Sequence, residues 1–405
     1  MGAQRNALRC VPRIILLTGV MLASHLFSWA QNGDPPAPTS NPAAEHVSWW
    51  KGITYDGLLS FSYTYNLNDP IPPLNQFRIF DFNDNEPQVD VAQLVVQHPV
   101  SNPGQFGFRV NFIVGAGIPE VTASYGMFRN NETGKGQPYD LLEFYLSYIV
   151  PVGKGLRLDL GKFVSPFGYE VVGGYNDFNE NFSRGFIFGY GLPFTQTGLK
   201  ASYALTKRIS GMLLLTNGCD AVKALNGSVT VAGILAVTTS RTTQITVNYL
   251  HGPQQPNNGH DQRAVYEIVG TWQLLPPLQL AMDALYADED HGAKNGSDAI
   301  WKGLAGYATY SFTKKFSLVF RGEVFADPSG ARTGTAQTLQ EFTLTPQYVT
   351  AANFSRWKPE LKHLDGKFVI RPEFRKDLST VSSFSKGLGF TNHQFTTAIN
   401  LIYLF

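Results

Sequence analysis

Charged side chains recur at every second position in several segments of this chain. Between residues 367 and 377, most charged residues take the odd positions, whereas Phe368, Ile370 and Phe374 lie between them. A β-strand places successive side chains on opposite faces, so this spacing gives a strand one ionic and one apolar face. The charged residues assigned to the ionic faces are Arg109, Glu143, Arg157, Asp159, Lys200, Glu267, Asp283, Arg321, Glu323, Glu341, Lys367, Arg371, Glu373, Arg375 and Asp377.

These charges are of both signs, and two explanations for them stay open. They could line a water-filled pore and set its electric field, or they could pair across strands and neutralise one another. The densest stripe contains Arg371 and Arg375. We expect these two residues to shape the field of the pore, so that replacing both with Gln changes ion selectivity.

No catalytic motif accompanies the charges. The sequence contains no H-E-x-x-H, no G-x-S-x-G, no P-loop and no C-x-x-C. Two acidic groups could hold a divalent ion, but both fall in expected loops and lack the spacing of a calcium loop. They are residues 288–291 and the set Asp81, Asp84 and Glu86. We therefore predict no enzymatic activity, no metal site and no cofactor.

Composition narrows the function classes. The chain has 405 residues, of which 43% are hydrophobic and 16% charged, with a formal net charge of +1. A neutral chain lacks the basic field that nucleic acid requires, and the apolar fraction is too high for a disordered chain. With two cysteines, Cys10 and Cys219, a disulfide framework is excluded.

The first fifty residues read as an export signal and a linker. Arg5, Arg9 and Arg13 precede an apolar run over 14–27, and small residues flank position 29. This order is typical of a secretory signal peptide over residues 1–30, with export through the Sec pathway and cleavage after Ala30. Residues 31–50 contain several prolines and are expected to form an extended periplasmic linker, which leaves residues 51–405 for the folded domain.

The folded part alternates apolar and polar residues in segments of about ten residues, which is the length that a tilted strand needs to cross a bilayer. In the last segment, Phe395, Ile399, Leu401, Tyr403 and Phe405 share one face. Backbone groups in hydrocarbon have no water to bond, so such strands must close into a barrel. We predict an all-β, transmembrane, antiparallel, up-and-down barrel of about sixteen strands, with fourteen or eighteen as alternatives.

The connections support this prediction, because short links alternate with long ones as in outer-membrane barrels. Short links are expected at 151–155, 206–208, 275–277 and 313–315, and long ones at 66–88, 115–138 and 165–194. The link at 351–363 is long for a turn, and Pro346 and Pro372 fall inside expected strands. Each proline removes a hydrogen bond from the strand ladder.

The longest loop, 165–194, is rich in aromatic residues that would be costly in open water. It either enters the barrel as a constriction or packs on the rim, and both alternatives stay open. The residues expected to form the constriction are Tyr175, Phe178, Phe182, Arg184 and Phe186.

Two segments in the middle of the chain have a more specific amino-acid sequence. Residues 161–170 read GKFVSPFGYE, and residues 186–198 read FIFGYGLPFTQTG. With NQFRIF at 75–80 and RPEFR at 371–375, these segments resemble the OmpL-like β-barrel porins over most of residues 53–405. Gln196 stands where His is expected in that family. The resemblance implies an outer-membrane channel but names no solute.

Together these features predict a bacterial outer-membrane porin for passive diffusion of small hydrophilic solutes or ions. The alternative is a barrel that acts through its extracellular loops as an adhesin or enzyme. Expected partners are outer-membrane lipid and the barrel-assembly machinery, since Phe405 resembles the terminal assembly signal of outer-membrane proteins. No nucleic-acid partner is expected, and a homo-oligomer is left open.

Overall fold

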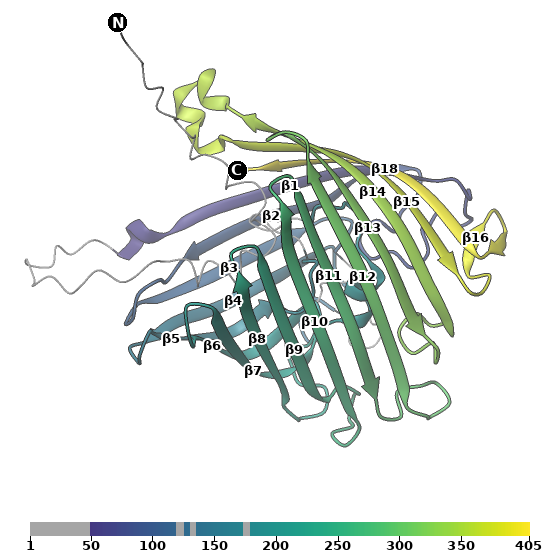
Figure 1. The fold of residues 1–405 in the computed structure, drawn as a ribbon, viewed down its shortest axis with the longest axis horizontal. Coiled ribbons are helices and arrows are strands. Elements are labelled where there is room, and N and C mark those ends of the chain that lie inside the picture. The colour runs from purple at the N-terminus through teal and green to yellow at the C-terminus, as the bar shows by residue number, and fades with distance from the viewer. Residues whose placement is uncertain (1–48, 119–124, 130–134, 173–178) are drawn as a thin grey trace, which may run out of the picture.

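The chain forms one closed antiparallel barrel of sixteen strands (Figure 1). The structure is a computed structural model that describes residues 49–118, 125–129, 135–172 and 179–405. The expected signal peptide and almost all of the expected linker lie outside these residues. The barrel strands are β1 (Thr54–Asn66), β2 (Glu86–His98), β3 (Phe106–Val114), β4 (Tyr139–Val150), β5 (Leu156–Val164), β6 (Thr195–Ala204), β7 (Ile209–Cys219), β8 (Thr230–Ser240), β9 (Thr243–Pro253), β10 (Gln262–Leu275), β11 (Leu278–Glu289), β12 (Ala299–Ser311), β13 (Phe316–Asp327), β14 (Gln337–Ala352), β15 (Gly366–Ser379) and β18 (His393–Leu404).

Each strand pairs with its neighbours along the chain, and β18 closes the barrel against β1. The closure includes the last residue, because Phe405 and Gly57 exchange backbone hydrogen bonds of 3.0 and 2.9 Å. Closure leaves the barrel without a free edge, as a lipid-embedded sheet requires. The predicted strand number and the predicted topology are therefore confirmed.

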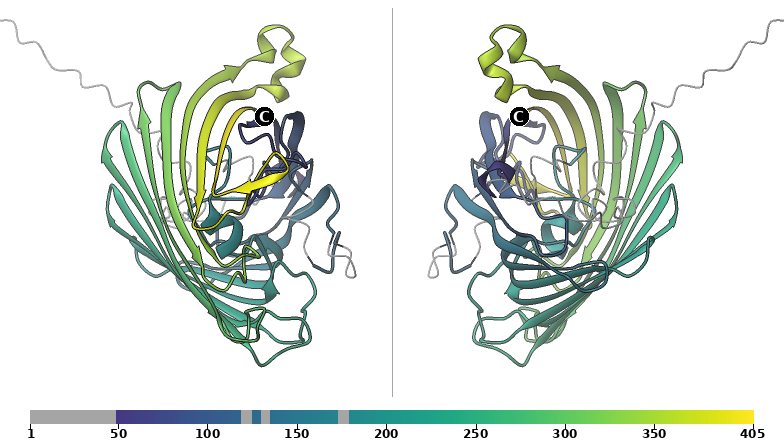
Figure 2. Two further views of the ribbon diagram at one scale, coloured as in Figure 1. Left: turned by 90° about the vertical axis from the view of Figure 1, so that its right-hand side faces the viewer. Right: turned by 90° about the vertical axis from the view of Figure 1, so that its left-hand side faces the viewer.

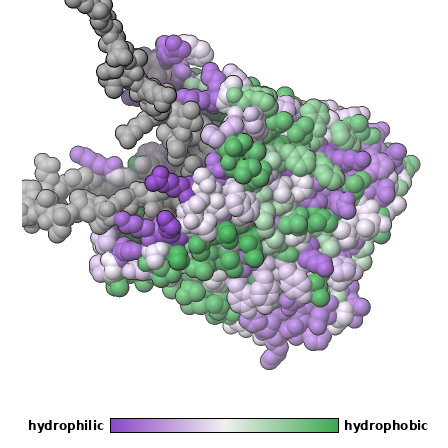
Figure 3. Space-filling model, viewed as in Figure 1, coloured by the Kyte–Doolittle hydropathy of each residue, from purple (hydrophilic) through white to green (hydrophobic). Residues whose placement is uncertain are grey.

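The two faces of the strands also alternate as predicted. In β18, Ile399 and Leu401 are exposed on the outer face, while Asn400 and Ile402 are buried on the inner face. Apolar side chains cover much of the visible wall in Figure 3, and hydrophilic ones gather towards the ends of the strands. Lys302 and Lys376 are exceptions, because both are exposed on the outer face, close to the long-loop ends of β12 and β15.

The remaining elements are small and lie in the connections. They are η1 (Trp49–Gly52), the π-helical segment η2 (Ile187–Gly191), the 3-10 helices η3 (Phe354–Arg356) and η4 (Pro359–Leu364), and the two-stranded ribbon of β16 (Phe384–Lys386) and β17 (Gly389–Thr391). Among the described residues, none of the helices is long and apolar enough to cross a membrane.

The ladder between β14 and β15 has a gap at the two predicted strand prolines. Pairing runs to Leu344 and Phe374, and resumes at Tyr348 and Ile370. The register of these pairs places Pro346 opposite Pro372. Because neither residue has a backbone N–H, neither can donate to the other strand.

Candidate functional site

The loop between β5 and β6, residues 165–194, is called the inner loop below, and its described residues, 165–172 and 179–194, lie inside the barrel. Its element η2 lies within the ring of strands in Figure 2 and contacts β12 and β11. Phe186 and Ile187 are each 1% exposed. They pack in one cluster with inward-facing residues such as Leu285 and Phe325. The inner face of the barrel is thus partly apolar where this loop covers it.

The described residues of the inner loop contact two separate parts of the barrel wall. Val172 packs on a cluster of Ile113, Ile118 and Leu142, on the side of β3 and β4. Asn181 donates a 2.8 Å hydrogen bond to Thr345 of β14 on another part of the wall. The described residues of the loop therefore contact both the β3–β4 part and the β14 part of the wall.

Two wall carboxylates hold the backbone of the loop. Glu373 of β15 accepts the N–H groups of Phe182 at 2.7 Å and Ser183 at 3.0 Å. Glu323 of β13 accepts the N–H groups of Phe186, at 2.7 Å, and Ile187. Hydrogen bonds from amides to a carboxylate are stronger than neutral ones, so these contacts fix the position of the loop.

A second pair of wall carboxylates holds the beginning of the loop. Glu267 of β10 accepts the N–H of Gly168 at 3.0 Å, and Asp283 of β11 accepts the N–H of Tyr169 at 3.1 Å. The Tyr169 ring packs on that of Tyr307, with 4.3 Å between centroids. The loop is therefore bound to the wall at both ends of its buried stretch.

Arginines of the wall connect these contacts into one chain of ion pairs. Arg321 bonds both Glu170 of the inner loop and Glu341 of β14, and Arg375 bonds Asp377 at 2.7 Å. The members are almost completely buried, so each charge depends on its partners for solvation. The full sequence of ion pairs is Glu170, Arg321, Glu341, Arg375, Asp377, Arg78 and Asp81.

The last two members show that the loop between β1 and β2 also enters the barrel. Arg78 bonds Asp377 at 2.8 Å and is 6% exposed. Phe80 of the same loop contacts Phe188 of the inner loop, with 6.4 Å between ring centroids. The two loops therefore pack on each other and occupy the lumen together.

Arg184 stabilises the fold of the inner loop itself. Its guanidinium donates to the carbonyls of Phe182 at 2.7 Å and of Val171 and Val172 at 3.2 Å each, and lies over the Phe80 ring. Burial lowers the pKa of Arg184 to about 10. The side chain is nevertheless protonated at neutral pH, so it remains a donor to all three carbonyls.

At the end of the loop, the carboxylate of Asp220 accepts the N–H groups of Phe194 at 2.9 Å and Thr195 at 2.8 Å. Burial raises the pKa of Asp220 to about 6, against the lowering effect of these two hydrogen bonds. The group is thus mainly ionised at pH 7 and accepts both bonds there. This contact fixes the point at which the chain leaves the lumen and begins β6.

The opposite wall, from β3 to β6, carries charges that pair with one another. Arg109 bonds Glu143 at 2.5 Å, and Asp159 is bonded by Arg157 at 2.9 Å and Lys200 at 3.3 Å. The cation is the more exposed partner in each pair. The side chains of Arg157 and Lys200 are 23% and 15% exposed, against 2% for Asp159.

The charged residues assigned from the sequence thus fall into three groups. Glu267, Asp283, Arg321, Glu323, Arg371, Glu373 and Arg375 bind the inner loop directly, and Asp377 and Glu341 link them. Arg109, Glu143, Arg157, Asp159 and Lys200 pair on the opposite wall. Lys367 is exposed at the short-turn end of β15.

Among the residues assigned to the constriction, Phe182, Arg184 and Phe186 lie in the buried part of the inner loop. Tyr175 and Phe178 lie outside the described residues. Sequence reasoning missed Glu170 and Arg78, although both stand inside the quoted segments GKFVSPFGYE and NQFRIF. Both residues stand near aromatic residues in a loop, and this pattern could have indicated that the charge is buried and pairs with a residue of the wall.

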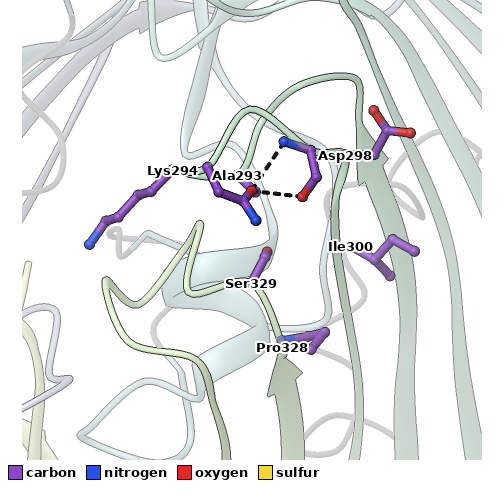
Figure 4. Close-up of a pocket in the computed structure, with 8 residues that line it drawn as sticks. Ala293, Lys294, Asp298, Ile300, Pro328 and Ser329 are labelled. Atoms are coloured by element: carbon purple, nitrogen blue, oxygen red, sulfur yellow. Dashed lines mark hydrogen bonds between the residues drawn. The ribbon is translucent and has the colours of Figure 1, made fainter.

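A cavity between two outer loops carries no arrangement of side chains that suggests a second site. A cavity of about 450 Å³ lies between the β11–β12 and β13–β14 loops, lined by residues such as Lys294, Asp298 and Ser329 (Figure 4). Asn295 on its edge accepts hydrogen bonds from the N–H and hydroxyl of Ser297. Within the described ranges, no three His, Cys, Asp or Glu side chains group together as a metal site would require.

Comparison with known proteins gives one family and several similar folds. The sequence model of the family "Putative beta-barrel porin-2, OmpL-like" matches residues 52–405. No functionally curated protein matches the sequence.

The fold is similar to solved outer-membrane proteins at low sequence identity. An anion-selective porin from Comamonas acidovorans has a TM-score of 0.55 at 9% identity, covering 87% of this chain and 99% of that one. OmpF of Salmonella typhi, in complex with daunomycin, has a TM-score of 0.55 at 10% identity, with 87% and 97% covered. The outer-membrane channel DcaP of Acinetobacter baumannii has a TM-score of 0.54 at 9% identity, again with 87% and 97% covered.

The ion-pair chain predicts a large effect for Arg321. Replacing Arg321 with Gln leaves Glu170 and Glu341 buried without their main cation, which should cost about 3–5 kcal/mol. Arg157→Gln is the matched control, because its pair is partly exposed and should cost at most about 1 kcal/mol. The free energy of unfolding, measured by denaturant titration in lipid vesicles, compares the two. Equal losses would contradict a special role for the buried chain.

Proposed function

The chain belongs to the family of OmpL-like β-barrel porins and is an outer-membrane porin, and we propose that its lumen conducts small hydrophilic solutes past a fixed constriction. The observation that carries this proposal is the inner loop, whose described residues lie inside the barrel and are hydrogen-bonded to four wall carboxylates. A sixteen-stranded barrel is wide enough for an aqueous channel, so a loop inside it sets the narrowest point.

The contacts of the loop favour a permanent constriction over a loop on the rim. The residues that bind it lie on β10, β11, β13 and β15, well inside the strands, and several are less than 3% exposed. Removing the loop would leave those charges without partners, which is costly. The loop is therefore part of the folded barrel rather than a mobile cover.

The wall from β3 to β6 supports a preference for anions. There three cations, Arg109, Arg157 and Lys200, stand against two carboxylates, and each cationic side chain is more exposed than the carboxylate it pairs with. In strands β7 to β14, the inward residues in the half of each strand nearer the short turns are neutral. Examples are Gln244, Thr271 and Gln279. A solute in this half of the lumen would meet a small excess of positive charge on one wall and neutral groups on the other.

The alternative of an adhesin or enzyme acting through outer loops has less support. Parts of loops β1–β2 and β5–β6, among them Arg78 and Phe182, are folded into the barrel, so these parts are not accessible to a partner. We propose that the barrel has no catalytic activity of its own. A homo-oligomer stays open, and crosslinking in outer membranes would determine whether it forms.

Export and assembly complete the proposal. We propose that a signal peptide over residues 1–30 directs Sec export and that barrel-assembly machinery recognises Phe405. The pairing of Phe405 with Gly57 at the closing seam supports a role for this residue in closure. N-terminal sequencing of the protein from outer membranes should begin at Gln31, and a sequence beginning at Met1 would contradict cleavage.

Deleting residues 176–184 should raise single-channel conductance, because the deletion removes residues 179–184, which lie inside the barrel against β14 and β15. The measurement is planar-bilayer recording with protein purified from outer membranes. A deletion of residues 256–260, in a loop at the outer end of β9, is the control and should leave conductance unchanged. Unchanged conductance after the first deletion would place the constriction elsewhere, and a barrel that never conducts would favour the adhesin or enzyme.

Replacing Arg157 and Lys200 with Gln should shift the reversal potential in a salt gradient away from anion preference, because the change removes both cations that pair with Asp159 and leaves its negative charge uncompensated. Arg241→Gln, in the turn after β8, is the control and should cause no shift. The pair Arg371→Gln and Arg375→Gln tests whether those arginines set the field. Since both are buried against the inner loop, we expect the pair to change conductance more than reversal potential. If the pair changed reversal potential more than conductance, Arg371 and Arg375 would be the residues that set ion selectivity.

A further inference from the structure

At one end of the barrel the strands are joined by short turns, and one connection at this end differs from all the others that the structure describes there. The links after β8 and β10 comprise residues 241–242 and 276–277, whereas the link after β14 comprises residues 353–365 and contains η3 and η4. It projects from the ends of β14 and β15, near the C terminus (Figure 1). Periplasmic turns of outer-membrane barrels are short, so this length needs a physical reason. The segment is called the long turn below.

The long turn has a defined fold. The carboxylate of Asp365 accepts the N–H of Ser355 at 2.9 Å and also its hydroxyl, which joins the two ends of the turn. The phenol of Tyr403 donates to the carbonyl of Leu364. These contacts fix the turn to the barrel at β18, so its surface is presented in one orientation.

The turn is built on the lipid-facing side of the barrel. Phe354 packs edge-on against Phe368 and Tyr403, with centroid distances of 6.3 and 5.8 Å. Both partners occupy outward positions of β15 and β18, and Tyr403 stacks on Phe405. Aromatic residues at this level form the girdle that lies at headgroup depth. The turn therefore continues the membrane interface instead of covering the mouth of the lumen.

The exposed surface of the turn combines one large aromatic residue with basic side chains. Trp357 is 80% exposed and contacts Phe354 at 6.0 Å, at the end of the ring cluster. Glu360 is the one acidic residue of the turn exposed beside it, since Asp365 is engaged by Ser355. The exposed basic residues in and next to the turn are Arg356, Lys358, Lys362, His363 and Lys367.

We propose that the long turn is a binding surface for anionic phospholipid headgroups of the periplasmic leaflet. Trp357 would lie among the headgroups as an extension of the aromatic girdle, and the basic side chains would contact the phosphates. Tryptophan prefers this depth, and each Lys or Arg near an anionic surface adds attraction. A periplasmic protein is a less suitable occupant, because the ring cluster places the surface beside the bilayer.

The test uses the protein purified from outer membranes and reconstituted into phosphatidylcholine vesicles with or without phosphatidylglycerol. The fluorescence of Trp357 is obtained by subtracting the tryptophan emission of the Trp357→Phe variant from that of the unaltered protein. Lipids with brominated chains quench tryptophan on contact. Brominated phosphatidylglycerol should half-quench this signal at a concentration roughly fivefold lower than brominated phosphatidylcholine, the ratio expected from one net Lys–headgroup attraction.

The charge variant Arg356→Gln, Lys358→Gln and Lys362→Gln should abolish this preference while Trp357 remains quenched. Its matched control is Lys314→Gln with Lys315→Gln in the short turn after β12, which should retain the preference. Equal quenching of the unaltered protein by both lipids would overturn the proposal. A Trp357 signal that neither lipid quenches would also overturn it and would assign the surface to a periplasmic partner. Because both outcomes concern the unaltered chain, they hold even if the charge variant does not fold.

Discussion

The absence of water in hydrocarbon determines how this chain folds. Every backbone N–H and C=O that crosses the bilayer needs a partner within the protein, and sixteen strands satisfy this need by closing on themselves. Closure creates an outside that must be apolar and an inside that can carry charge. The alternation of faces in β15 and β18 follows from this one constraint, as does the pairing of Phe405 with Gly57 at the seam.

The same closure makes the interior a place where charge must be neutralised. Once two loops enter the lumen, wall residues such as Arg321 and Glu373 lose their access to water. The inner loop supplies their partners. A backbone amide donates to Glu373, and a backbone carbonyl and Glu170 accept from Arg321. Loop and wall therefore depend on each other. An apolar wall could not hold this loop backbone, and without the loop the wall charges would lack these partners.

The sequence predicts the strands well because their signal is local. A period of two in β15, for example, depends only on neighbouring residues, and hydrocarbon enforces it. The partners of the inward charges are not local. Glu323 binds the amide of Phe186, which is 137 positions away, and Arg371 binds the carbonyl of Asn179, 192 positions away. Alternation shows that such residues face inward, but only the path of the inner loop decides whether they meet water or backbone.

The gap at Pro346 and Pro372 shows how closely wall and loop are connected. The ladder between β14 and β15 is broken there, yet the hydroxyl of Thr345 donates to Glu373 across the gap at 2.8 Å. Asn181 of the inner loop donates to the same Thr345, and Glu373 accepts two loop amides. Side chains and loop backbone thus join the two strands where prolines prevent the ladder from doing so. Since a barrel in lipid cannot tolerate an open seam, the inner loop contributes to closure of the wall as well as to the constriction.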